Sequence, residues 1–167
     1  MTKEEKALLD MIAYAEGTLG VFNNGYDVLV GYNKIVGWTP DTKIVHGGSA
    51  WYDSKNKSNA AGRYQFLYNT WLGGTKEKQG PNLAMTKLNQ DKRGLELINV
   101  KIGSMDKTTL NNINNFKLAT DQLAKTWASI PLSTTGSSYY SKDGINKAKH
   151  SVEDLFEVYK KALTLYS

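Results

Sequence analysis

The chain has 167 residues, of which 40% are hydrophobic and none is cysteine. This length suits one domain with one core, no apolar run is long enough to cross a membrane, and the lack of cysteine excludes disulfides and thiolate metal sites. The net charge of +5 comes from dispersed lysines and suits a polyanionic partner, either nucleic acid or an acidic cell-wall polymer. Two histidines, His46 and His150, are too few for a histidine-rich metal centre. We therefore expect neither a metal nor an organic cofactor.

A capped amphipathic helix is predicted at the start of the chain. Thr2 and Glu5 have the spacing of a capping box, and Gly17 can end the helix in a left-handed conformation. The apolar stripe of this helix consists of Leu8, Met11, Ile12 and Ala15. No apolar segment follows a basic start, so we expect synthesis without a signal peptide.

Residues 18–67 lose the helical period and carry many Gly, Asn and Ser. This composition is typical of short β-strands and long loops, and we predict strands within 26–30 and 43–45. Residues 64–67 then lead into a short helix that ends near Trp71.

The helical pattern returns from Thr86 onward, and that threonine is a predicted helix cap. Further helices are predicted over 107–115, over 120–130 with a stop before Pro131, and over 151–166 with Ser151 as the cap. Their apolar positions are Leu88, Leu95, Ile98, Leu123, Trp127, Ile130, Leu155, Val158, Ala162 and Leu165. Of these, Trp127 is more typical of a core residue than of a ligand.

These elements predict an α+β fold in a single domain over 1–167. A mainly helical lobe and a small β-rich lobe, formed by about 18–67, would have a cleft between them. Glu16 lies where the first helix ends, and the partial negative charge of a helix C-terminus disfavours a carboxylate there. If partly buried, this glutamate would hold its proton near neutral pH, as a general acid must. The alternative is an ordinary solvated glutamate at a fraying helix end.

Four blocks of the sequence, in this order and at this spacing, resemble the lambda-type phage endolysins. The blocks are Ala13-Tyr14-Ala15-Glu16-Gly17-Thr18, Gly25-Tyr26-Asp27-Val28-Leu29-Val30-Gly31, Ala61-Gly62-Arg63-Tyr64-Gln65-Phe66-Leu67 and Trp127-Ala128-Ser129-Ile130-Pro131. The pair Gln90-Asp91 is also similar to the corresponding part of that family. The resemblance implies a lysozyme-like fold and a lytic transglycosylase that cuts the glycan strands of peptidoglycan.

Such an enzyme cleaves the MurNAc–GlcNAc β-1,4 bond without water, because the C6 hydroxyl of MurNAc closes onto C1 as a 1,6-anhydro ring. Glu16 matches the family's catalytic glutamate and would act first as acid and then as base. A hydrolytic muramidase would instead need a placed water and a second carboxylate, for which Asp27 and Asp53 are candidates. A non-catalytic wall-binding module is a further alternative, which the presence of both Glu16 and Gln65 disfavours.

The run Gly62-Arg63-Tyr64-Gln65 resembles the Gly-x-x-Gln element of several transglycosylase groups. The resemblance implies that the Gln65 amide binds sugar or orients the reactive carboxyl, while the alternative is an amide that caps the backbone. Tyr64 is also expected to contact substrate, and Arg63 is interpreted as structural.

The other substrate-binding residues implied by the resemblance lie on loops and turns. Lys57 and Ser58 match positions on the rim of the cleft, and a tyrosine of the loop after Pro131 matches a cleft tyrosine. Tyr139 is our choice for that tyrosine, with Tyr140 as the alternative. Asp27 is a further candidate, although the residues around it favour a hydrogen bond within a strand or turn as its role.

The expected partner is the glycan strand of peptidoglycan, bound by a monomer. Dispersed basic residues without a helix-turn-helix or stacking motif speak against nucleic acid, and no membrane insertion is expected. The protein would be made in the host bacterial cytoplasm and act on the cell wall. It would reach the wall through a holin-type pore formed by another protein, or as a component of the phage particle.

Overall fold

The computed structural model describes residues 1–73, 83–143 and 147–167. The chain forms two compact units, of which one combines Met1–Gly17 with Leu97–Ser167 and the other is Thr18–Glu96. We call them unit 1 and unit 2, and the helix α3 (Lys87–Ile102) contributes to both. The predicted β-rich insertion lies wholly within unit 2. The single domain and the cleft stay predictions.

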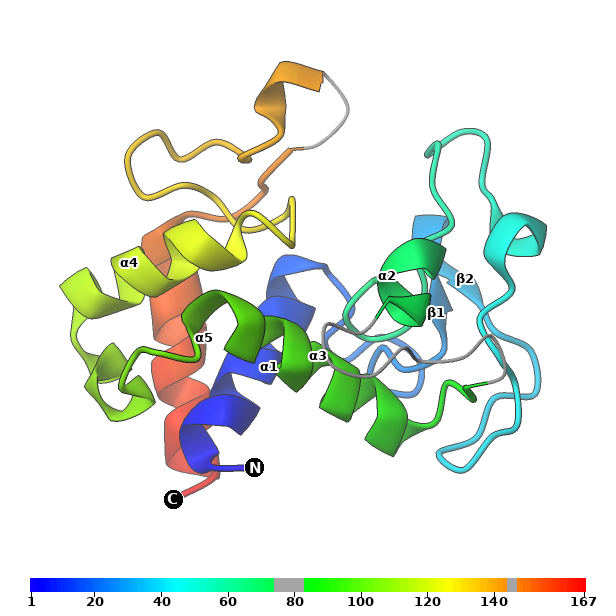
Figure 1. Cartoon of the computed structure of the whole chain (residues 1–167), viewed down its shortest axis with the longest axis horizontal. Helices are drawn as coiled ribbons and strands as arrows, with labels where there is room; N and C mark the ends of the chain where they lie inside the picture. The colour runs from blue at the N-terminus through cyan, green and yellow to red at the C-terminus, as the bar shows by residue number, and fades with distance from the viewer. Residues whose placement is uncertain (74–82, 144–146) are drawn as a thin grey trace. The chain divides into compact units, whose positions relative to one another are not determined.

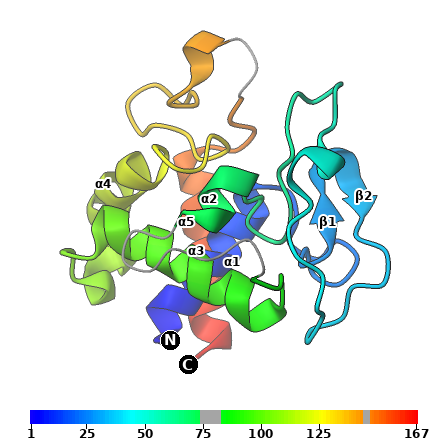
Figure 2. The same cartoon turned by 45° about the vertical axis from the view of Figure 1, so that its right-hand side comes forward.

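Unit 1 is helical and holds both ends of the chain. It contains α1 (Lys3–Ala15), α4 (Ile113–Leu123), α5 (Val152–Leu165), the end of α3 and the 3-10 turns η3 (Lys107–Asn111) and η4 (Ser141–Asp143). Helices α1 and α5 lie side by side, so the two termini are neighbours (Figures 1 and 2). The fully buried side chains of its core include Leu8, Met11, Ile12, Ile98, Ile102, Leu110, Phe116, Leu123, Leu155 and Tyr159.

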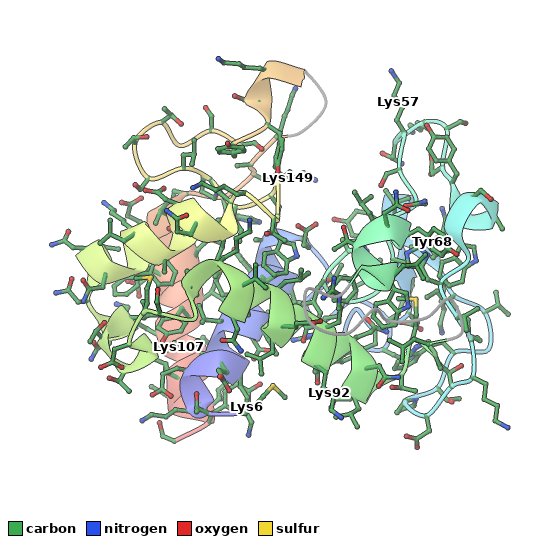
Figure 3. The ribbon with its side chains drawn as sticks, in the orientation of Figure 1. Lys6, Lys57, Tyr68, Lys92, Lys107 and Lys149 are labelled. Carbon is green, nitrogen blue, oxygen red and sulfur yellow. The ribbon has the colours of Figure 1, made fainter. Side chains whose placement is uncertain are left out.

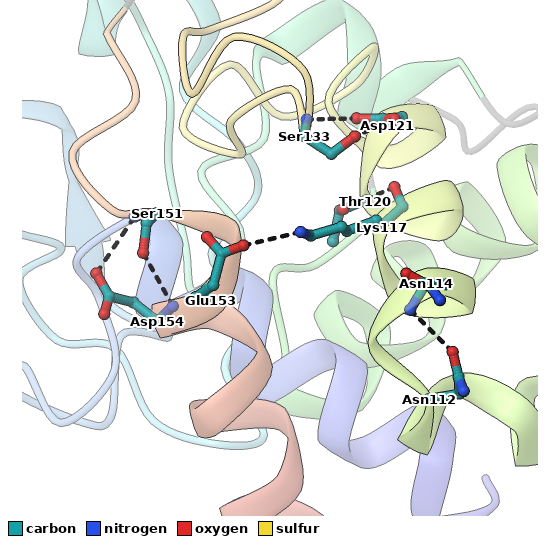
Figure 4. Close-up of polar contacts among 9 residues, drawn as sticks. All are labelled: Asn112, Asn114, Lys117, Thr120, Asp121, Ser133, Ser151, Glu153 and Asp154. Carbon is teal, nitrogen blue, oxygen red and sulfur yellow. Dashed lines mark hydrogen bonds and ion pairs between the residues drawn. The ribbon is translucent and has the colours of Figure 1, made fainter.

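Local capping signals in unit 1 are confirmed. Thr2 accepts a hydrogen bond from the N–H of Glu5 (3.2 Å), whose carboxylate accepts from the N–H of Thr2 (2.9 Å). Ser151 and Asp154 form the same capping box at the start of α5 (Figure 4). Gly17 follows α1 with φ of 72°, the left-handed conformation predicted for it.

The predicted helix over 120–130 is wrong in its bounds. Helix α4 begins after Asn112, whose side chain accepts from the N–H of Asn114 at 2.9 Å, and it ends at Leu123 (Figure 4). The chain then turns, with the N–H of Trp127 bonded to the Leu123 carbonyl (3.0 Å), and Trp127 is still a core residue. Two of the apolar positions of the predicted helices, Leu88 and Leu165, lie outside the core, since 57% and 72% of their surfaces are exposed.

Unit 2 has little regular structure. It contains β1 (Val28–Leu29), β2 (Asn33–Lys34), the 3-10 turns η1 (Val30–Tyr32) and η2 (Gly48–Trp51), helix α2 (Tyr68–Leu72) and the first part of α3. The strands pair antiparallel, with Val28 opposite Lys34. The backbone of Ala60 to Gly62 extends this pairing, because Val30 donates to Ala60 and Gly62 donates to Val28.

The strand predicted at 43–45 is reduced to a single bridge between Val45 and Ala84, and the short helix near Trp71 is confirmed as α2. Side chains rather than strand ladders hold unit 2 together. Tyr26 stacks on Trp38 with ring centroids 5.8 Å apart, and the indole N–H of Trp38 donates to the Met85 carbonyl at 2.8 Å. Within the described ranges, no helix is long and apolar enough to cross a membrane.

Candidate active site

Glu16 caps the C-terminal end of α1, as predicted. Its backbone is still helical, with φ of −73° and ψ of −8°, and its N–H donates to the Ile12 carbonyl at 2.9 Å. The residues before it, including Ala13 and Ala15, are buried, whereas the Glu16 side chain is half-buried. The apolar stripe of α1 therefore anchors the helix and leaves the carboxyl group at its end.

Ser129 donates a hydrogen bond from Oγ to Oε1 of Glu16, at 2.6 Å. This length is typical of a hydroxyl that donates to a carboxylate. Two buried neighbours hold Ser129 in place: Trp127 on one side and Ile130 on the other, with the N–H of Ile130 bonded to the Trp127 carbonyl at 3.0 Å. The turn after α4 thus presents one hydroxyl to the end of α1.

Burial raises the pKa of Glu16 to about 7 from an ordinary value of 4.5, while the Ser129 hydrogen bond and the charge of Lys149 act in the opposite direction. Lys149 is an exposed side chain on the segment that leads into α5 (Figure 3). Near neutral pH, Glu16 is therefore divided between its acid and its carboxylate. A group in this condition can both give and accept a proton.

Tyr139 and Tyr140 lie in the loop that follows the Ser129 turn. A bridge between Pro131 and Ser138 closes the base of this loop. The hydroxyl of Tyr140 donates to the Lys125 carbonyl at 2.7 Å, whereas Tyr139 is 49% exposed and packs edge-on against Tyr140. The backbone contact of Tyr140 leaves Tyr139 as the better candidate for binding a ligand.

Gln65, in unit 2, ends a tight turn in an unusual conformation. Its φ is 47°, in the left-handed region that non-glycine residues rarely adopt, and such strain clusters at functional sites. The amide Nε2 donates to the Gly62 carbonyl (3.0 Å) and to the Val28 carbonyl (3.3 Å). The amide nitrogen thus caps the backbone, which is the alternative considered from the sequence, and sugar binding through Oε1 stays a prediction.

The buried side chain of Gln90 stabilises this turn through hydrogen bonds. Its Oε1 accepts from the N–H of Arg63 at 2.9 Å, and its Nε2 donates to the carbonyls of Tyr26 and Met85, both at 2.9 Å. Gly62 has φ of 80°, and an added Cβ would clash with Oε1 of Gln90. The Gly-x-x-Gln element therefore needs glycine for close approach as well as for backbone conformation.

Tyr64 and Asp27, which were expected to bind substrate, are both enclosed in unit 2. Tyr64 is 1% exposed, and its hydroxyl donates to Asp91 at 2.7 Å. Asp27 is fully buried and accepts from the backbone and side chain of Asn23, at 3.0 and 2.6 Å. Side chains enclosed in this way hold unit 2 together. Arg63 is buried as well, over the ring of Tyr26, in agreement with its structural interpretation.

Lys57 and Ser58 belong to a tight loop. The backbones of Ser58 and Asp53 exchange two hydrogen bonds, and Asp53 also accepts from the N–H of Asn56 at 2.9 Å. Lys57 is exposed at the tip of this loop and extends away from the ribbon (Figure 3). Its ammonium is available to a ligand, whereas the Oγ of Ser58 accepts from the N–H of Ala60 at 3.1 Å.

The two histidines have ordinary surroundings. Nε2 of His46 lies 2.8 Å from the Phe66 carbonyl oxygen, which can only accept, so this nitrogen carries the proton. Nδ1 of His46 accepts from the N–H of Gly48 at 3.1 Å. Burial lowers the pKa of His46. The ring of His150 packs on Tyr14 with centroids 4.4 Å apart. Over the described residues, no group of three His, Cys, Asp or Glu side chains could hold a metal ion.

Ser129 and Lys149 were not among the predicted site residues. Ser129 belongs to the run Trp127-Ala128-Ser129-Ile130-Pro131, but the sequence around it does not indicate a hydrogen bond to Glu16. The two residues are 113 positions apart and meet only in the fold. Lys149 is one of many dispersed lysines. Only the three-dimensional contact distinguishes either residue.

Solved lysozyme structures share this fold. The bacteriophage lambda lysozyme complexed with a chitohexasaccharide has a TM-score of 0.66 and 26% identity, over 97% of this chain and 95% of that chain. A second structure, lysozyme from bacteriophage lambda, has a TM-score of 0.60 over the same shares, and its 24% identity supports the fold alone. The predicted α+β, lysozyme-like fold is confirmed.

Related sequences identify the family of this chain. The Endolysin family model matches residues 6–165. The endolysin of Escherichia phage P2 is 32% identical over 165 residues, which cover 93% of this chain and 90% of the relative, and that of Escherichia phage lambda is 28% identical over 149 residues, or 87% and 88%. The chain belongs to the endolysin family and is a cell-wall-degrading enzyme of the lambda lysozyme type.

Proposed function

We propose that this endolysin is a lytic transglycosylase that cleaves the MurNAc–GlcNAc β-1,4 bond of peptidoglycan. The observation that carries the proposal is the state of Glu16, whose pKa of about 7 leaves it available as both acid and base at neutral pH. In the described part of the chain, the groups that shift this pKa are Ser129 and Lys149, and neither is a carboxylate. Paired carboxylates are the rule for hydrolytic glycosidases, whereas the two groups that shift the pKa of Glu16 are a hydroxyl and an ammonium.

The two carboxylates considered for hydrolysis have other roles. Asp27 is fully buried, and its carboxylate accepts a hydrogen bond from the Asn23 side chain. The Asp53 carboxylate accepts hydrogen bonds from the backbone and side chain of Asn56. Those hydrogen bonds lower the pKa of Asp53, as they do for a carboxylate that organises a turn. These contacts favour a reaction that needs Glu16 alone.

In the proposed reaction, protonated Glu16 gives its proton to the glycosidic oxygen as the C1–O bond breaks. The electron pair of that bond leaves with the GlcNAc oxygen. The Glu16 carboxylate then takes the proton of the MurNAc C6 hydroxyl while that oxygen bonds to C1. The 1,6-anhydro ring closes, Glu16 is protonated again, and no water is consumed.

We further propose that Gln65, Tyr139, Lys57 and Ser58 bind the glycan strand. The lambda lysozyme structure contains a bound chitohexasaccharide, and an oligosaccharide of this kind is the expected ligand here. The exposed Lys57 ammonium suits the carboxylates of the peptide stems, and the exposed ring of Tyr139 suits a sugar face. We also propose a monomer, made in the host cytoplasm, that meets the wall through a holin-type pore or as part of a phage particle.

Mass spectrometry of the muropeptides released from purified peptidoglycan tests the reaction. Anhydro-muramyl ends, one water lighter than reducing ends, are the expected product. Glu16→Gln should lower the rate by roughly 1,000-fold or more, because it removes the acid and the base together. Asp53→Asn is the matched control and should keep most of the activity. Reducing ends as the products would show a hydrolase instead, whereas loss of activity in Asp53→Asn with anhydro products would reflect the turn before Lys57 that Asp53 organises.

A further inference from the structure

The two oxygens of the Glu16 carboxyl group are not equivalent. Oε1 accepts the hydrogen bond from Ser129 at 2.6 Å, and a serine hydroxyl has one hydrogen to donate. When Glu16 is a carboxylate, this hydrogen bond satisfies Oε1. When Glu16 is protonated, the same hydrogen bond is strongest if Oε1 is the carbonyl oxygen and Oε2 carries the proton, because a carbonyl oxygen accepts better than a hydroxyl oxygen.

We propose that Ser129 is a positioning residue, whose hydroxyl holds Oε1 and so reserves Oε2 for the proton that is given to and recovered from the substrate. The inference rests on the proposed function, because it assigns the atom through which Glu16 acts as acid and base. Ser129 exchanges no proton in this scheme. The proton leaves Oε2 for the glycosidic oxygen, and the proton of the C6 hydroxyl returns to Oε2.

The surroundings of Ser129 give its hydroxyl a fixed direction. Trp127 and Ile130 are 4% and 0% exposed, so the turn that carries Ser129 is anchored on both sides. The Leu123 carbonyl, at the end of α4, accepts the N–H of Trp127 at 3.0 Å and ties the same turn to the helix. A hydroxyl on so constrained a turn can select one rotamer of the Glu16 side chain.

Two segments supply the groups that act on Glu16. Lys149, before α5, lowers the pKa of Glu16 by its positive charge, and Ser129 contributes an uncharged donor from the turn after α4. His150, next to Lys149, is a further titratable group, and its ring packs on Tyr14 of α1. Comparison of variants at Ser129 alone leaves the effects of Lys149 and His150 constant.

Ser129→Ala is the test, with Ser129→Thr as the conservative variant. Loss of the hydrogen bond should raise the pKa of Glu16, seen by ¹³C NMR of its carboxyl carbon in the substrate-free enzyme, and move the pH–rate profile to higher pH. Because a hydrogen bond to a charged group is removed, kcat should fall by roughly 10- to 100-fold with a smaller change in KM. Ser129→Thr keeps the hydroxyl and should restore both the pKa and much of the rate.

Ser133→Ala is the matched control. The hydroxyl of Ser133 also donates to a carboxylate, that of Asp121 at 2.7 Å, in the same loop (Figure 4). It should lower stability without moving the Glu16 pKa or the pH profile. An unchanged Glu16 pKa in Ser129→Ala, or equal loss of rate in Ser129→Ala and Ser129→Thr at an unshifted pH profile, would overturn the proposal.

This experiment separates the inference from the reaction type. The NMR titration needs no substrate, so a raised Glu16 pKa in Ser129→Ala supports the positioning role even where product analysis finds reducing ends. Anhydro products together with an unmoved Glu16 pKa would instead support the reaction and refute the role of Ser129.

Discussion

Replacing Glu16 by glutamine should stabilise the fold at alkaline pH while it removes the proposed acid and base. Burial raises the pKa of Glu16 to about 7 in the folded protein, from an ordinary value of 4.5. Between these values the folded state keeps a proton that the unfolded state releases. The free energy of unfolding therefore falls as pH rises through this window, and it levels off above pH 7.

The size of this effect follows from the two pKa values. At roughly 1.4 kcal/mol per pH unit, the interval from 4.5 to about 7 corresponds to about 3 kcal/mol. The Glu16 side chain is half-buried, so solvent screening should reduce the realised cost to about 2 kcal/mol. Glutamine has the shape of the protonated glutamate and no charge to desolvate, so Glu16→Gln should recover this amount at pH 8 and very little at pH 4.

Urea unfolding of the wild type and Glu16→Gln at pH 4 and pH 8 measures the difference directly. Titrations of all other groups cancel in the comparison of the two proteins at each pH. Glu157→Gln is the control, because Glu157 is exposed on α5 and its variant should follow the wild type at both pH values. The assignment of a desolvated carboxyl group would be refuted if Glu16→Gln had no higher free energy of unfolding than the wild type at pH 8. It would also be refuted if the gain over the wild type were the same at pH 4 as at pH 8.

Two further predictions concern the surroundings of Glu16 and the turn of unit 2. Lys149→Gln removes a positive charge that acts on Glu16 and should raise the Glu16 pKa in an NMR titration, whereas an unchanged pKa would exclude that interaction. Gly62→Ala should cost about 3 kcal/mol in thermal or urea unfolding, because left-handed strain adds to a clash with Gln90. Gly37 is also left-handed, but an added Cβ there meets open space, so Gly37→Ala should cost only about 1 kcal/mol. Equal losses of stability in Gly62→Ala and Gly37→Ala would exclude the clash.

Local chemistry made the starts of α1 and α5 predictable. A capping box needs only two residues three apart, and those at Thr2 and Ser151 form as their spacing indicates. The end of α4 was missed because tertiary packing buries Trp127 on a non-helical turn, and an apolar spacing of three or four residues suits either conformation. Hydrophobic period alone does not separate these cases.

The sequence predicted the position of Glu16 in the candidate site but not the residues that contact its carboxyl group. The position of Glu16 at a helix end follows from its neighbours along the chain. The partner hydroxyl of Ser129 depends on a contact between segments 113 residues apart, which no local pattern encodes. Tyr64 and Asp27 show the opposite case: motif membership predicts contact with a ligand, whereas both side chains are buried and hydrogen-bonded within unit 2.

The division of unit 1 between the two ends of the chain has a consequence for the timing of folding during synthesis. Its first 17 residues carry Glu16, but their packing partner α5 is Val152–Leu165, which is synthesised long after them. At about 5–20 residues per second, α1 waits several seconds or more before α5 is available. Unit 2, a continuous stretch, can form in that interval. The Glu16 carboxyl therefore acquires its packed setting only after α5 has been synthesised, and a chain truncated before α5 should not degrade the wall.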